Sequence, residues 1–302
     1  MTEQVEATPV AFCGLGRMGV PMAQRIAAAG FPMTVWERFE SVAEEFARAN
    51  RVRQALTPAE AAAGADIVVT MLANASILLD VMEGEDGLLA GMKPGSVLVD
   101  CATIGAQGAS DARSLCDTHG VNFVSSPVSG STDLAAQGQL FLMIGGEPSV
   151  IASVTPVLST FAKSMLVMGR AEAAAATKVA INGLLHTFNA GLAEMVITTE
   201  RNGVERARFF DALSNSVLAN AYLGYKRANY ESPDHATVAF DLKTAAKDLD
   251  LAVQSAVAVG LHHPLIGDVL RLHQAACSAG LESKDMAALA EYLDQQATPN
   301  AS

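Results

Sequence analysis

The sequence predicts an α/β protein in which a doubly wound, mostly parallel sheet in residues 1–168 is followed by an all-α domain in residues 169–302. In the first part, short apolar runs of strand length alternate with amphipathic helical segments, which is the pattern of βα units in a parallel sheet. After Gly169 this alternation stops and only helical periodicity remains. We therefore place a domain boundary at this change of pattern.

The strands expected in the first domain are short, apolar and bounded by turn residues. They cover residues 10–13, 33–37, 67–72, 96–100, 122–124, 140–144 and 165–168. Helices are expected between them at 76–82 and 106–119, and after two matches to the capping box that begin at Ser41 and Thr57. In the second match Pro58 takes the first helical position, where its missing N–H costs no hydrogen bond.

In the second domain the expected helices span residues 172–202, 205–213, 241–259, 264–278 and 284–295. The first of them contains a single lysine, Lys178, in an alanine-rich stretch. Asn182 and His186 follow it by one and two helical turns, so the three side chains share one face. A lysine on a covered face gives up its proton more easily, whereas a snorkelling lysine only extends its amine to water. The helix alone favours the snorkelling interpretation.

The composition argues against several classes of function. A net charge of −12 with scattered basic residues disfavours nucleic-acid binding, because phosphates would be repelled. No run approaches the roughly 18 apolar residues of a membrane span, and the acidic N-terminus is unlike a signal peptide. The four cysteines are far apart and the histidines lack ligand spacing, so no disulfide framework and no metal site are expected. We expect a soluble, cytoplasmic protein.

A glycine-rich loop, Gly14-Leu-Gly-Arg-Met-Gly19, directly follows the first expected strand. In a dinucleotide-binding Rossmann fold, Gly14 permits the tight turn and Gly16 lets the backbone approach the pyrophosphate. Gly19 permits close packing of helix on strand, and the phosphates lie at the helix N-terminus. The glycine spacing alone is a weak signal, but a strand before it and a second strand after it favour a dinucleotide site.

Five motifs together resemble the β-hydroxyacid dehydrogenases, a family that includes 3-hydroxyisobutyrate dehydrogenase and the glyoxylate/succinic semialdehyde reductases. They are G-L-G-R-M-G at 14–19, D-C-A-T-I at 100–104, S-P-V-S-G-S at 126–131, K-V-A-I-N at 178–182 and K-D-L at 247–249. They occur in the family's order, with Phe240 at the spacing of the semialdehyde reductases. The resemblance implies NAD(P)-dependent hydride transfer between nicotinamide and a small β-hydroxy acid or carboxylated (semi)aldehyde.

The resemblance also implies a role for individual residues. Lys178 is the implied general acid/base, with Asn182 beside it, because hydride transfer to a carbonyl leaves negative charge on oxygen. The implied substrate contacts are Ser129, Gly130, Ser131, Thr103, Phe240 and Asp248. The implied cofactor contacts are Gly14, Leu15, Gly16, Arg17, Met18, Gly19, Glu37, Arg38, Leu72, Ala73, Thr103 and Lys247. The serine and glycine loop at 129–131 suits a small carboxylate, because hydroxyls and backbone N–H groups form an anion-binding nest.

Several residues depart from the family's pattern. Ala102 replaces a usual serine, and Ala73 replaces a common proline. Glu172 and Ala174 stand where glycines usually precede the lysine. These departures keep the reaction type but leave the substrate and the detailed cofactor contacts open.

The choice between NAD and NADP depends on Glu37 and Arg38, which follow the second expected strand. An acid at this place bonds the adenosine ribose diol and repels a 2′-phosphate, whereas an arginine attracts one. The sequence has both residues, so both cofactors stay open. NAD is favoured, because Glu37 occupies the acidic position.

Two other functions are compatible with this architecture. An imine reductase shares the glycine motif, but such enzymes usually carry aspartate or tyrosine where Lys178 stands. A non-catalytic, dehydrogenase-like module would bind a cofactor or partners without turnover, and the retained lysine counts against it. Under each interpretation, apolar helix faces that are exposed in a monomer would be buried between subunits. We therefore expect a homo-oligomer, a dimer or tetramer, formed through the helical domain.

Overall fold

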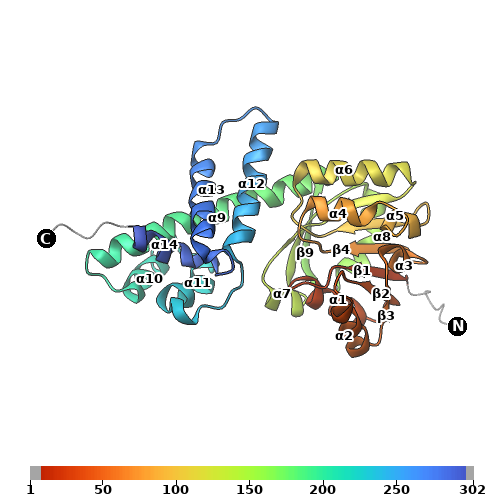
Figure 1. Ribbon diagram of the computed structural model, residues 1–302, viewed down its shortest axis with the longest axis horizontal. Coiled ribbons are helices and arrows are strands. Elements are labelled where there is room, and N and C mark those ends of the chain that lie inside the picture. The colour runs from red at the N-terminus through yellow and green to blue at the C-terminus, as the bar shows by residue number, and fades with distance from the viewer. Residues whose placement is uncertain (1–7, 297–302) are drawn as a thin grey trace. The chain divides into compact units, whose positions relative to one another are not determined.

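The computed structural model describes residues 8–296 and divides into two compact units, Met1–Lys178 and Val179–Ser302 (Figure 1). The division falls inside one long helix, α9 (Ala171–Arg201). The acidic N-terminal segment, on which the expected localisation depended, lies outside the described residues. Within the described part, no helix is both long and apolar enough to cross a membrane.

The first unit is built on one sheet, and most of its expected strands are found within one or two residues of their predicted bounds. The strands are β1 (Val10–Cys13), β2 (Met33–Trp36), β3 (Arg53–Gln54), β4 (Ile67–Thr70), β5 (Val97–Asp100), β6 (Asn122–Ser125), β7 (Val128–Ser129), β8 (Leu140–Gly145) and β9 (Ala162–Gly169). Their order is β3-β2-β1-β4-β5-β6-β8-β7, with β9 beside β8. All pairs from β3 to β6 are parallel, whereas β8 runs antiparallel to β6 and β7. The sheet is therefore mostly parallel, as predicted.

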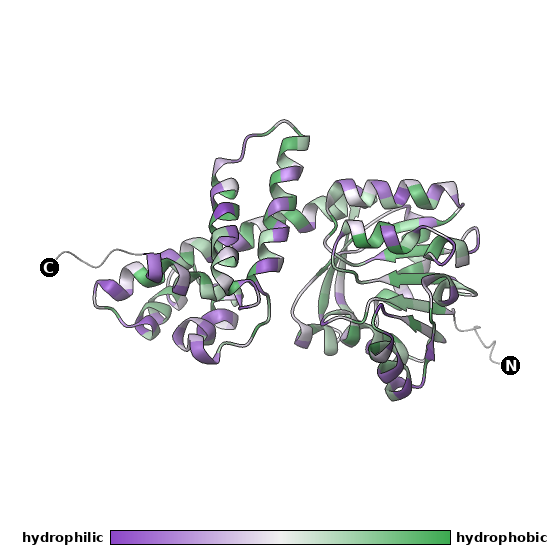
Figure 2. Cartoon of the chain, viewed as in Figure 1, coloured by the Kyte–Doolittle hydropathy of each residue, from purple (hydrophilic) through white to green (hydrophobic). Residues whose placement is uncertain are grey.

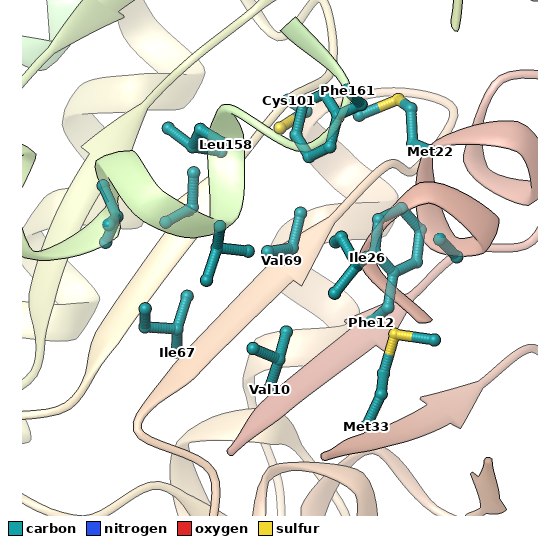
Figure 3. Packing of buried hydrophobic residues seen from close by; sticks show 14 of the residues in the cluster. Val10, Phe12, Met22, Ile26, Met33, Ile67, Val69, Cys101, Leu158 and Phe161 are labelled. Carbon is teal, nitrogen blue, oxygen red and sulfur yellow. The ribbon is translucent and has the colours of Figure 1, made fainter. Parts of the chain in front are cut away.

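Helices cover both faces of this sheet, which makes the first unit doubly wound. They are α1 (Gly19–Ala28), α2 (Glu40–Asn50), α3 (Pro58–Ala62), α4 (Ala75–Met82), α5 (Leu88–Gly91), α6 (Gly105–Thr118), α7 (Thr132–Ala136) and α8 (Pro148–Leu158). Alternate residues of β1 point to opposite faces of the sheet. Val10 and Phe12 pack with α1, α2 and α8 on one face. Ala11 and Cys13 pack with α4, α5 and α6 on the other. Figure 3 shows the first of these cores, and Figure 2 shows the hydrophobic character of the strands.

One of the two predicted capping boxes is confirmed and the other is wrong. The Thr57 side chain accepts a hydrogen bond from the backbone N–H of Glu60 at 3.1 Å, with Pro58 at the start of α3. Ser41 does not cap α2, which begins one residue earlier, at Glu40. The N-cap residue is therefore Phe39, whose apolar side chain has no acceptor for the first N–H groups; its backbone carbonyl accepts the N–H groups of Val42 and Ala43.

The second unit contains helices and no β-strand between residues 179 and 296. Besides α9 it has α10 (Arg206–Ser214), α11 (Ala221–Glu231), α12 (Leu242–Ala258), α13 (Pro264–Ala276) and α14 (Leu289–Gln296). Three short helical turns lie between them, η1 (Pro233–His235), η2 (Cys277–Leu281) and η3 (Met286–Ala288). Helix α11 was not predicted from the sequence; it begins where the Asn220 side chain accepts the backbone N–H of Leu223. This unit has its own hydrophobic core.

A buried ion pair holds the start of α12 in the second unit. Lys226 Nζ lies 2.7 and 2.6 Å from the two carboxylate oxygens of Asp285, and both side chains are only 1% exposed. The same carboxylate accepts backbone N–H groups from Ala239, Phe240 and Ala287. The pair thus fixes the backbone that leads into α12, including the position of Phe240.

We expect Lys226→Met to lower the free energy of unfolding by about 3–5 kcal/mol, because it leaves a buried carboxylate without its counter-ion. Urea denaturation can be followed separately in each unit, since the single tryptophan, Trp36, lies in the first and all four tyrosines lie in the second. Lys243→Met removes an exposed lysine of the same unit and should change stability by about 0.5 kcal/mol or less. Equal, small effects of both variants would contradict this role of the pair.

Candidate active site

The glycine loop lies at the point where the chain order of the sheet reverses. Strand β1 has β2 on one side and β4 on the other, and the loop follows its carboxyl end. Gly14 has a φ of 105°, and a Cβ there would collide with the carbonyl oxygen of Met71. A Cβ on Gly19 would collide with the carbonyl oxygen of Gly14. Both positions therefore require glycine for the fold itself.

Gly16 differs from its two neighbours in the motif, because a Cβ there would meet nothing within 4 Å. The residue is exposed, and the fold gives no steric reason for a glycine at this position. Its open backbone lies just ahead of the N-terminus of α1, where backbone N–H groups point outward. The loop therefore fits the pyrophosphate of a dinucleotide, which the backbone of Gly16 could approach closely.

Glu37 is attached to this loop by a hydrogen bond. Its carboxylate Oε2 accepts the backbone N–H of Leu15 at 2.7 Å, so the acid at the end of β2 is held beside the glycine loop. Burial, together with the charge of Glu37, raises the pKa of the Cys13 thiol to about 12, so the thiol stays neutral. Arg38, next in the chain, is exposed. A negative charge is thus fixed at the loop, while the neighbouring positive charge projects outward.

Asp100 shapes the turn that carries Thr103 at the carboxyl end of β5. Its carboxylate accepts the Thr70 hydroxyl at 2.9 Å and the backbone N–H of Ala102 at 3.2 Å. The Ala102 side chain is buried in the core beside α6 and is only 2% exposed. The alanine therefore fills an apolar position, which accounts for one departure from the family's pattern.

The loop at 129–131 lies at the same carboxyl edge of the sheet, between β7 and α7. Gly130 has a φ of 144°, and a Cβ there would press against the Leu140 side chain. The Ser131 hydroxyl accepts the backbone N–H of Leu134 at 3.3 Å as the cap of α7. A hydroxyl that accepts in this way keeps its own proton to donate to an anion. Leu72 and Ala73 follow β4 at this edge, just before α4.

The lysine helix α9 is anchored to the first unit by its first turn. The Glu172 carboxylate accepts Arg113 Nε of α6 at 2.9 Å. Burial raises the pKa of Glu172, but its own backbone N–H and the Arg113 guanidinium lower it below the usual value. Ala171 and Ala175 belong to the core beside α6, and Ala174 is fully buried. Glu172 and Ala174 thus hold the helix by an ion pair and close packing, where the family usually has glycines.

Further along α9 the face that carries Asn182 is covered. Asn182 is 3% exposed and His186 is fully buried, whereas Lys178 is half-buried. Asn182 Nδ2 donates to Asp248 Oδ2 of α12 at 2.6 Å, and Lys247 Nζ lies 2.9 Å from Asp248 Oδ1. Burial raises the pKa of Asp248, but His186 and the charge of Lys247 lower it below the usual value, so the carboxylate is ionised.

An ionised carboxylate only accepts hydrogen bonds, so Asp248 requires that Asn182 present its NH₂ group. The carbonyl oxygen of Asn182 then remains as an acceptor for another donor. Asp248 was expected to contact the substrate, and the structure places its carboxylate in a buried cluster with Asn182 and Lys247. The substrate contact itself stays a prediction. No local pattern signals the contact between Asn182 and Asp248, because the two residues are 66 positions apart.

The structure brings the predicted site residues together in two groups. In the first unit, the expected cofactor residues other than Lys247 follow the carboxyl ends of the strands, together with Thr103 and the loop at 129–131. In the second unit, Asn182, Lys247 and Asp248 form one cluster, and the Phe240 ring lies 5.2 Å from the His186 ring beside it. Among residues 8–296, no group of acidic, histidine or cysteine side chains could hold a metal ion.

Family models match nearly the whole chain. The model described as the NAD binding domain of 6-phosphogluconate dehydrogenase matches residues 9–169. The model described as the NAD-binding domain of NADP-dependent 3-hydroxyisobutyrate dehydrogenase matches residues 173–293. Together they identify this chain as an NAD(P)-dependent oxidoreductase.

Individual relatives agree with these matches. Mitochondrial 3-hydroxyisobutyrate dehydrogenase of Rattus norvegicus is 30% identical, over 96% of this chain and 88% of its own. Chloroplastic glyoxylate/succinic semialdehyde reductase 2 of Arabidopsis thaliana is 28% identical, over 96% and 81%. A solved structure of Mycobacterium tuberculosis 3-hydroxyisobutyrate dehydrogenase with L-serine has a TM-score of 0.84 and 27% identity, and the match covers 95% of this chain and 99% of that one. The chain therefore belongs to the β-hydroxyacid dehydrogenase family.

Proposed function

We propose that this protein interconverts a small carboxylated aldehyde and the matching β-hydroxy acid, with Lys178 as the general acid/base. The observation that carries the proposal is the ordered side chain of Asn182, one turn after Lys178 on α9 and fixed by the ionised Asp248. Because its NH₂ group is taken by Asp248, its carbonyl oxygen can accept a hydrogen bond from the lysine ammonium. A lysine held in this way has a defined direction for its proton.

When bound, NAD(P)H would supply a hydride to the carbonyl carbon of the substrate. The carbonyl oxygen gains negative charge as the C=O double bond becomes a single bond, and a donor within hydrogen-bond reach stabilises it. In our proposal the Lys178 ammonium donates its proton to this oxygen and becomes a neutral amine. In the oxidative direction the neutral amine removes the hydroxyl proton as the hydride leaves.

The loop at 129–131 is the proposed carboxylate site. Its hydroxyls and backbone N–H groups can donate to an anion, and Gly130 keeps the backbone accessible, since the residue is exposed. Thr103 is proposed to contact both substrate and cofactor. The serine-glycine-serine form of the loop, together with Phe240, favours a semialdehyde or glyoxylate as substrate.

The glycine loop, Glu37, Arg38, Leu72, Ala73 and Lys247 are the proposed cofactor contacts. NAD is favoured because the Glu37 carboxylate, held 2.7 Å from the Leu15 nitrogen, would repel a 2′-phosphate. Residues 1–168 are proposed to bind the cofactor, and residues 169–302 to contribute substrate contacts and pair subunits. Exposed apolar side chains of the helical unit, such as Leu184, Val257 and Leu261, support a homo-oligomer. A cytoplasmic location stays a prediction.

Lys178→Ala should lower kcat by about 10²–10⁴-fold, because the developing oxyanion loses its proton donor. Lys178→Arg should be similarly slow, since a guanidinium keeps its proton. Binding of NADH, measured by fluorescence titration, should stay unchanged in both variants. Lys163→Ala, which removes an exposed lysine of β9, is the matched control and should retain activity. Undiminished turnover of the Lys178→Ala protein would remove Lys178 from the mechanism.

Initial rates with NADH and NADPH should show a preference for NADH. Glu37→Gln should lower the NADH-to-NADPH ratio of kcat/KM by about tenfold, because it removes the charge that opposes a 2′-phosphate. The control is Glu44→Gln, which removes an exposed charge on α2 and should leave the ratio as it is. A wild-type preference for NADPH above about tenfold would contradict the assignment of Glu37.

A panel of glyoxylate, succinic semialdehyde, tartronate semialdehyde, 3-hydroxyisobutyrate and a cyclic imine, each assayed with both cofactors, tests the substrate class. We expect turnover of the carboxylated aldehydes. Ser129→Ala should raise their KM by about tenfold, because one donor to the carboxylate is lost. Ser114→Ala, on the exposed side of α6, serves as the control. Activity on the imine alone would favour an imine reductase, and no turnover at all would favour a non-catalytic module.

A further inference from the structure

Two buried histidines lie beside Asp248 in the second unit, and the mechanism above gives neither of them a role. His186 of α9 and His273 of α13 are both fully buried, and their ring centroids are 6.1 Å apart. Both ring nitrogens of His186 and Nε2 of His273 lack a hydrogen-bond partner within residues 8–296. Buried polar atoms are nearly always paired in folded proteins, so three unmatched nitrogens in one cluster call for an explanation.

His273 can only accept a hydrogen bond at its unmatched nitrogen. Its Nδ1 lies 2.8 Å from the backbone carbonyl oxygen of Val269, so Nδ1 carries the proton. Burial lowers the pKa of His273 to about 4, and the ring is therefore neutral near pH 7. Its Nε2 then keeps a lone pair and has no proton to donate.

His186 lies next to two acceptors. One belongs to His273, whose ring centroid is 6.1 Å from that of His186, and the other is the Asp248 carboxylate, whose Oδ2 is 3.8 Å from His186 Nε2. This separation is in the range of an ion pair and about 1 Å longer than a hydrogen bond. The same Oδ2 accepts the NH₂ group of Asn182 at 2.6 Å. A proton on His186 Nε2 would therefore face the oxygen that orients Asn182.

Few other groups hold the Asp248 carboxylate in this orientation. Lys247 pairs with the opposite oxygen, Oδ1, but 29% of its side chain is exposed, so water competes for its charge. The titratable groups packed around His186 are Asp248 with its partner Lys247 on α12, and His273 on α13. The Phe240 ring packs against the imidazole at 5.2 Å and restricts its rotation.

We propose that His186 is a positioning residue, which carries its proton on Nε2 and keeps the Asp248 carboxylate turned toward Asn182. The Asn182 carbonyl oxygen then stays in place to accept a hydrogen bond from the proposed proton donor, Lys178, one turn earlier on α9. His186 acts through Asp248 and does not touch the substrate. This inference rests on the proposed function of Lys178 and Asn182.

The position of the proton can be measured without turnover. In the full chain with ¹⁵N-labelled histidine, long-range ¹H–¹⁵N spectra near neutral pH report which nitrogen of each ring carries hydrogen. The signals can be assigned from His186→Gln and His273→Gln proteins. We expect a protonated Nε2 on His186, a neutral His273 protonated at Nδ1, and a shift of the His186 signals in Asp248→Asn. A neutral His186 with its proton on Nδ1 would overturn the inference.

Kinetics of the enzyme with cofactor test the consequence for catalysis. His186→Leu should lower kcat by about tenfold or more, while substrate KM and NADH affinity change by less than about threefold. Glutamine places an amide NH₂ near the position of the ring Nε2, so His186→Gln should restore kcat to within about threefold of wild type. His273→Leu, the matched control in the same cluster, should lower thermal stability and leave kcat within about threefold. Failure of glutamine to rescue kcat would contradict the positioning role.

A double variant separates positioning from mere packing. In an Asp248→Asn background, His186→Leu should cost less than about twofold in kcat, because the carboxylate it orients is gone. A packing role would give the same loss in both backgrounds, with a matching fall in thermal midpoint. If the wild type turns over nothing on the substrate panel, the proposed function fails, while the spectra still decide where His186 carries its proton.

Discussion

The hydrogen bond from Asn182 to Asp248 is the contact on which the proposed chemistry depends. It joins α9 to α12 at 2.6 Å, and both side chains are almost completely buried. A buried carboxylate is costly unless it is paired and hydrogen-bonded, and Asp248 meets this requirement with Lys247 and Asn182. Breaking the contact would leave the buried Asp248 carboxylate with too few partners and would destabilise the helical unit. The same free energy that stabilises the fold therefore keeps the Asn182 amide in its orientation.

In the first unit, backbone N–H groups are available to balance the negative charge of a bound dinucleotide. A dinucleotide brings negative charge to the N-terminus of α1, where N–H groups point outward and the open side of Gly16 admits a close approach. Glu37 accepts the Leu15 N–H, so its carboxylate lies beside this loop. In the proposed cofactor assignment, the hydrogen bond that holds Glu37 at the loop also places its charge where it would repel a 2′-phosphate.

Features that are encoded locally could be predicted from the sequence, whereas contacts that depend on packing could not. Most strands, the turn of the glycine loop and the Thr57 cap follow from short patterns, and the structure confirms them, whereas the two-residue strands β3 and β7 were not predicted. The Ser41 cap was wrong because α2 begins one residue earlier, which places Ser41 inside the helix. Helix α11 was missed because its buried residues are few and interrupted by polar ones. The partners of Asn182 and of Lys226 could not be predicted, since each contact joins residues about sixty positions apart.

The ion pair between Glu172 and Arg113 gives the departures from the family's pattern a physical meaning. Glycines ahead of the lysine would allow the backbone to bend and leave the start of α9 weakly held. In this chain α9 begins at Ala171, and its first turn is fixed by a 2.9 Å ion pair and by buried alanines. The helix that carries Lys178 is therefore pinned at its base by side chains of the first unit and, one turn beyond the lysine, by Asp248 of the second. If Lys178 is the proton donor, as proposed, its backbone belongs to a helix that is held on both sides of it, which is the positioning that directional proton transfer requires.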